Sequence, residues 1–122
     1  MTDDETILGV IETLAARHGA TSRIAMFGGT AVLLGGNMVA ALSPRGLLLR
    51  VGGDRHDAAL ARPGTRPMEV RGNPMRGYLY VDPAGLDSAS LQDWAQMAVD
   101  HVAGLPAKAA RRERGPRRMV ED

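Results

Sequence analysis

The chain has 122 residues, of which 44% are hydrophobic and only 3% aromatic, so it suits a single domain with a core of aliphatic side chains and methionine. It contains no cysteine, which excludes disulfides and thiolate metal sites. The amino terminus is acidic and no apolar run is long enough to span a bilayer. We therefore expect a cytoplasmic protein with no signal peptide and no membrane partner.

The formal net charge of +1 conceals an uneven distribution of charge. Most of the charged side chains among the first 20 residues are acidic, whereas residues 106–118 carry six basic side chains and a single glutamate. We therefore expect a folded domain over residues 1–105 and a basic tail over residues 106–122.

The first predicted element is a helix that begins at Thr2 and ends near Gly19. Thr2 and Glu5 have the spacing of a capping box, in which each side chain accepts a hydrogen bond from the other residue's backbone amide. The helix carries one apolar stripe, formed by Ile7, Ile11, Leu14 and Ala15. This stripe predicts a face that packs on the core.

Residues 26–51 are predicted to form a meander of three strands. The glycines and asparagine at 35–37 suit the positive φ values of a tight hairpin, and Ser-Pro-Arg-Gly at 43–46 suits a type I turn. The predicted strands are residues 30–34, 38–42 and 47–51. They are apolar on both faces apart from Thr30 and Arg50, so we expect helices on one face and at least partial cover on the other, for example in a homodimer.

The remaining residues of the expected domain are predicted to form a short helix, two strands and a long helix. A short helix capped by Asp54 covers residues 54–62, and alternating patterns predict strands at 67–71 and 77–81. The last helix begins at Asp87 or Ser88, and its buried face comprises Leu91, Trp94, Ala95, Ala98 and Val102. This order predicts an α+β, two-layer domain of antiparallel strands: helix, three-strand meander, short helix, two strands, helix.

Several motifs in this order resemble the amino-terminal domain of the TfoX family, also called Sxy. They are Met26-Phe27-Gly28-Gly29, Gly36-Asn37-Met38, the strand at 47–51 with Arg50, and Leu91-x-x-Trp94-x-x-x-Ala98. The chain is especially similar to the stand-alone, single-domain subgroup, through Met68-Glu69-Val70 and residues 74–81. The resemblance implies a compact α+β domain. The best-known members of the family carry a second domain and act as transcriptional coactivators of natural competence genes, so the resemblance also implies a role of this kind.

No catalytic or cofactor motif stands out in the sequence. The paired glycines lack the lysine and hydroxyl residue of a Walker loop, and no serine lies in a nucleophile elbow. The histidines His18, His56 and His101 fall on three different predicted elements, and we expect His56 to be solvated. We therefore expect no metal, no cofactor and no enzymatic activity.

The leading hypothesis is a protein-interaction module that acts as an accessory factor for transcription. Its candidate interaction residues lie on the sheet and at one corner of it: Met26, Phe27, Gly28, Gly29 and Arg50. The expected partner is a protein of the transcription machinery.

Two alternatives stay open. One is nucleic-acid binding through the basic side chains of the tail, which are Lys108, Arg111, Arg112, Arg114, Arg117 and Arg118. The other is a small-ligand or enzymatic site around Arg50, which interrupts an apolar strand and either lies on an exposed sheet face or points into a pocket. Tyr78 and Tyr80 share one predicted strand face, where cross-strand packing is commoner than stacking on a base.

Overall fold

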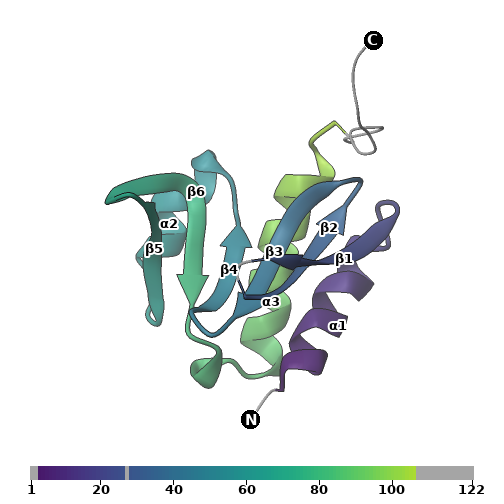
Figure 1. The fold of residues 1–122 in the computed structure, drawn as a ribbon, viewed down its shortest axis with the longest axis horizontal. Helices are drawn as coiled ribbons and strands as arrows, with labels where there is room; N and C mark the ends of the chain where they lie inside the picture. The colour runs from purple at the N-terminus through teal and green to yellow at the C-terminus, as the bar shows by residue number, and fades with distance from the viewer. Residues whose placement is uncertain (1–2, 27, 107–122) are drawn as a thin grey trace.

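The computed structural model describes residues 3–26 and 28–106, which contain one antiparallel sheet and three α-helices (Figure 1). The sheet has six strands in the order β1-β2-β3-β4-β6-β5. Their bounds are β1 Thr21–Met26, β2 Gly29–Leu34, β3 Asn37–Ser43, β4 Gly46–Arg50, β5 Thr65–Val70 and β6 Asn73–Val81. The helices are α1 Asp4–Ala15, α2 His56–Leu60 and α3 Ser88–Ala103, with short 3-10 helices η1 at Gly53–Arg55 and η2 at Pro83–Gly85.

The predicted α+β class and the predicted order of elements are confirmed. Gly35 and Gly36 have φ values of 58° and 83°, as the tight hairpin between β2 and β3 requires. The last helix begins where expected, because the Asp87 side chain accepts from the backbone N–H of Ser90 at 2.8 Å in a capping box.

The strand β1 adds a member to the predicted meander. It pairs with β2 along its whole length, from Thr21 opposite Leu34 to Met26 opposite Gly29. Most of its residues are exposed, because it forms one edge of the sheet. An edge strand of this kind has no clear alternation of apolar and polar residues, and for that reason the sequence did not indicate it.

Two predicted helix caps differ in the structure. The N-cap of α1 is Asp3, whose carboxylate accepts from the backbone N–H of Thr6 at 2.8 Å, whereas Thr2 lies outside the described residues. The Glu5 carboxylate accepts from the guanidinium of Arg23 on β1. Asp54 lies within η1, and neither η1 nor α2 has a side-chain cap.

The main core lies between the helices and one face of the sheet. Helices α1 and α3 pack against each other behind the sheet, and α2 lies near β5 and β6 (Figure 1). The largest fully buried side chains of this core are Ile7, Ile11, Leu47, Leu49, Leu79, Leu91, Val32, Val39, Val51, Val99 and Val102. Burying aliphatic side chains of this size contributes about 1.5–3 kcal/mol each, so this layer supplies most of the driving force for folding.

Candidate functional site

The opposite face of the sheet carries a second apolar cluster that is built from strand residues alone. Its buried members are Ala31, Ala41, Leu48 and Tyr80, and the partly buried Met26, Met38, Met68 and Tyr78 pack against them. All three helices contribute to the first core and none to this cluster. We call these eight residues, with Arg50 and Arg66 beside them, the helix-free face.

Strand register explains how this cluster forms. Ala31 lies opposite Ala41, Ala41 opposite Leu48, and Leu48 opposite Tyr80, so one row of side chains crosses β2, β3, β4 and β6. Small alanines at one end of the row are followed by larger side chains at the other. The row therefore brings side chains from four strands together on one surface.

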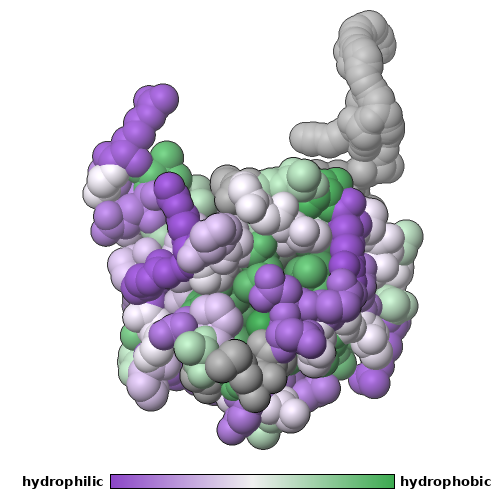
Figure 2. Space-filling view, turned by 60° about the horizontal axis from the view of Figure 1, so that its bottom comes forward, coloured by the Kyte–Doolittle hydropathy of each residue, from purple (hydrophilic) through white to green (hydrophobic). Residues whose placement is uncertain are grey.

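Three methionines and a tyrosine surround the buried row. Met26, Met38, Met68 and Tyr78 keep part of their surface accessible while packing on the cluster. Figure 2 shows hydrophobic side chains in the middle of one view of the molecule with hydrophilic side chains around them. Methionine is flexible and polarizable, so a surface of this composition can adapt its shape to a partner.

Two arginines lie over the tyrosines of this face. The Arg50 guanidinium carbon is 5.7 Å from the centre of the Tyr78 ring, and that of Arg66 is 4.7 Å from the Tyr80 ring. Arg66 also donates to the backbone carbonyl of Arg45. These cation–π contacts hold two positive charges beside an apolar surface. Arg50 is half-buried on the sheet face, one of the two placements expected from the sequence.

The corner at Met26, Gly28 and Gly29 is the turn between β1 and β2. Gly28 has a φ of 77°, which only glycine adopts readily, and a Cβ on Gly29 would lie 1.9 Å from the backbone oxygen of Leu42. The backbone conformation at Gly28 and the close packing at Gly29 therefore explain why glycine occupies both positions. Met26 packs on the helix-free face, and the remaining candidate of the corner, Phe27, lies outside the described residues.

The candidate nucleic-acid residues of the tail, Lys108 to Arg118, also lie outside the described residues. The hypothesis that they bind nucleic acid stays a prediction.

The three histidines are not brought together. His56 is buried rather than solvated, and its Nδ1 accepts from the backbone N–H of Gly77 at 3.0 Å. Burial lowers the pKa of His101, and the nearby positive charges of Arg50 and Arg55 lower it further. Within residues 3–26 and 28–106, no group of three or more His, Cys, Asp or Glu side chains could hold a metal ion.

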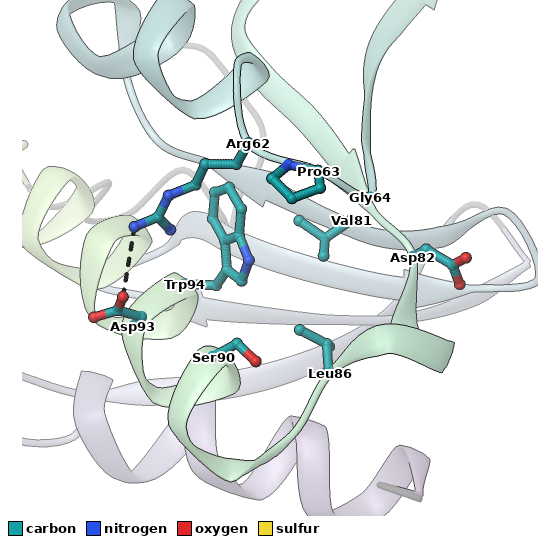
Figure 3. A pocket seen from close by; sticks show the side chains of 9 residues that line it. All are labelled: Arg62, Pro63, Gly64, Val81, Asp82, Leu86, Ser90, Asp93 and Trp94. Carbon is teal, nitrogen blue, oxygen red and sulfur yellow. Dashed lines mark hydrogen bonds and ion pairs between the residues drawn. The ribbon is translucent and has the colours of Figure 1, made fainter.

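A cavity of about 380 Å³ lies elsewhere, between the loop after α2, the end of β6 and the first turns of α3 (Figure 3). Trp94 lines it, together with Arg62, whose guanidinium carbon is 4.5 Å from the indole. The sequence predicts Trp94 as a buried residue of the last helix, and it is only 5% exposed. The cavity itself had no sequence signal, because its walls come from segments that are distant in the chain.

Comparison with known protein families gives a match that covers most of the chain. The family model for the TfoX N-terminal domain matches residues 12–102. A search of curated proteins found no match. None of the helices in the described ranges is both long enough and apolar enough to cross a membrane.

Proposed function

Because the chain belongs to the TfoX N-terminal domain family, we propose that it is a non-enzymatic protein-interaction module that assists a transcription regulator. The family is associated with the control of natural competence, and the sequence motifs extend the likeness over most of the chain. Fold alone does not carry function, so the proposal depends on a surface suited to a partner.

The observation that carries the proposal is the helix-free face. Its apolar residues come from β1, β2, β3, β4, β5 and β6, and no helix of the described residues contributes to it. Aromatic residues, methionine and arginine are the types enriched in protein interfaces, and all three occur here. Tyr80 and Leu48 form a buried centre, and the partly exposed side chains around them would exclude water from a contact.

The charges on this face indicate the chemistry of the partner. Arg50 and Arg66 place positive charge next to the apolar centre, where each stacks on a tyrosine. A partner surface with apolar side chains in its middle and carboxylates around them would complement this arrangement. Guanidinium groups also bind carboxylates in a bidentate manner, which favours one orientation of the partner.

The non-enzymatic part of the proposal is supported by what the carboxylates do. Asp87 caps α3, Asp82 accepts from the backbone N–H of Ala84, and Asp3 caps α1. Each of these has a structural role at the end of a helix.

The test is affinity purification of the tagged protein from its native cell, with a charge placed on the proposed surface. Met68 packs on the cluster and is partly exposed, so Met68→Lys should reduce recovery of the partner about tenfold or more without unfolding the domain. Met75, a methionine that is 38% exposed and lies outside the cluster, provides the matched control Met75→Lys. Equal recovery of every partner by both variants and the parent would contradict the proposal.

A further inference from the structure

The cavity beside Trp94 is separate from the helix-free face and contains a buried hydrogen-bond donor that has no acceptor among the described residues. Its volume of about 380 Å³ falls in the range of small-molecule sites. Its apolar walls are Pro63, Val81, Leu86 and Trp94, and its polar lining comprises Arg62, Asp82, Ser90 and Asp93 (Figure 3).

The indole N–H of Trp94 is the unusual group in this cavity. The residue is 95% buried, and its N–H has no hydrogen-bond acceptor among the residues that the structure describes. Figure 3 shows the indole nitrogen facing the space between Val81, Leu86 and Ser90. A buried tryptophan usually finds an acceptor, and a buried donor without one lowers the stability of the folded protein.

The polar neighbours of the indole already have partners. The Ser90 hydroxyl donates to Asp87 Oδ1 at 2.6 Å and accepts from the Asp87 backbone N–H at 3.2 Å. Asp82 accepts from the Ala84 backbone N–H, and its carboxylate points away from Trp94 in Figure 3. The Ser90 hydroxyl is therefore already engaged and does not serve as the acceptor for the indole N–H.

The charge of the lining does not favour an ion as the occupant. The Arg62 guanidinium stacks on the indole and lies 3.5 Å from the Asp93 carboxylate, which offsets its charge. An anion would also meet Asp93, and a cation would meet Arg62 and lose its hydration against apolar walls.

We propose that this cavity binds a small, uncharged and largely apolar molecule that presents a carbonyl oxygen to the indole N–H of Trp94. A ketone, ester, lactone or amide has this chemistry. The aliphatic body fills the space against Val81, Leu86 and Pro63, and the carbonyl accepts the hydrogen bond that the described residues do not provide. The site does not depend on the helix-free face.

The test uses three probes with one ring and different head groups: cyclohexanone, cyclohexanecarboxylate and cyclohexylammonium. Trp94 is the only tryptophan of the chain, so its indole N–H gives a single, unambiguous resonance in a ¹H–¹⁵N spectrum. Cyclohexanone should move this resonance saturably, together with the backbone amides of Gly64 and Val81. Its affinity should exceed that of either charged probe about tenfold or more. No movement of the indole resonance, equal effects of all three probes, or tightest binding of the carboxylate would each overturn the proposal.

Two variants separate the indole donor from the arginine. Trp94→Phe removes the donor and keeps an aromatic ring, so the affinity for cyclohexanone, followed at the Gly64 and Val81 amides, should fall about tenfold. Arg62→Met removes the charge and keeps an apolar stem, and the affinity should stay within about threefold. Loss of binding in Arg62→Met with unchanged binding in Trp94→Phe would show that the cation, not the indole, holds the ligand, and would overturn the proposal. Thermal unfolding of both variants establishes that each is folded.

Discussion

At the scale of single residues, Gly52 packs against the imidazole of His101 with no room for a side chain. Gly52 has a φ of 90°, and a Cβ there would lie 2.4 Å from His101 Nδ1. Gly52→Ala should therefore lower the free energy of unfolding by about 2 kcal/mol or more, from backbone strain together with overpacking. Urea denaturation measures this change.

A double-mutant cycle separates the two causes. In a His101→Ala background the ring is gone, so Gly52→Ala should retain only the backbone part of its cost, about 1–2 kcal/mol. An identical cost of Gly52→Ala in both backgrounds would mean that the imidazole is not the obstacle.

His101 also predicts a pH dependence of stability. Burial, followed by the charges of Arg50 and Arg55, lowers its pKa in the folded protein below the ordinary value of 6.5, whereas Asp54 acts in the opposite direction. The unfolded chain then binds the proton more readily, so this contribution to stability is present above pH 6.5 and is lost as the pH falls through the folded pKa. Between neutral pH and the acid side, His101→Gln should lose less stability than the parent in urea titrations. Parallel stability curves for the two proteins would contradict this assignment.

At the scale of elements, one arginine joins the edge strand β1 to helix α1. Arg23 Nη2 lies 2.7 Å from a carboxylate oxygen of Glu5 and 2.7 Å from one of Glu12, and Arg23 Nε also donates to Glu12 at 2.7 Å. Hydrogen bonds from Arg23 lower the pKa of both glutamates. Their contribution is therefore present above the ordinary glutamate value of 4.5 and is lost in acid.

The variant Arg23→Met tests this link. It keeps the aliphatic stem but removes the charge, so the melting temperature should decrease slightly at low salt, and the difference should shrink in about 1 M salt because surface ion pairs are screened. Arg17→Met is the control, since the described part of the chain gives Arg17 no ion pair. A salt-independent difference would point to packing rather than charge.

At the scale of the whole molecule, deletion of the basic tail tests the alternative hypothesis that the protein binds nucleic acid. If its six cations bind phosphates, the full chain should retard DNA at low salt, and the retardation should weaken steeply as salt is added. Deleting residues 107–122 should abolish the shift and leave cooperative unfolding intact, because the described core clusters lie before residue 107. An unchanged mobility shift after the deletion would end this hypothesis.

The sequence by itself determined the features that depend on neighbours within a few residues. The glycines of the hairpin at 35–37, the cap at Asp87 and the apolar stripe of α3 are local choices of backbone conformation or of helical spacing, and the structure contains all three. Joined in chain order, they were enough to predict the α+β class. The family motifs extended this prediction to the whole domain.

The tertiary structure alone decided which distant groups meet. The hydrogen bond between His56 and Gly77, the link from Arg23 to Glu5 and the cavity at Trp94 all join segments that are separated in the chain. Such contacts depend on how the helices and the sheet pack together, and the pattern of residues within one element does not predict them. Arg50 was noticeable in the sequence because it interrupts an apolar strand. Its position over Tyr78 depends on the pairing of β4 with β6, which the sequence pattern does not show.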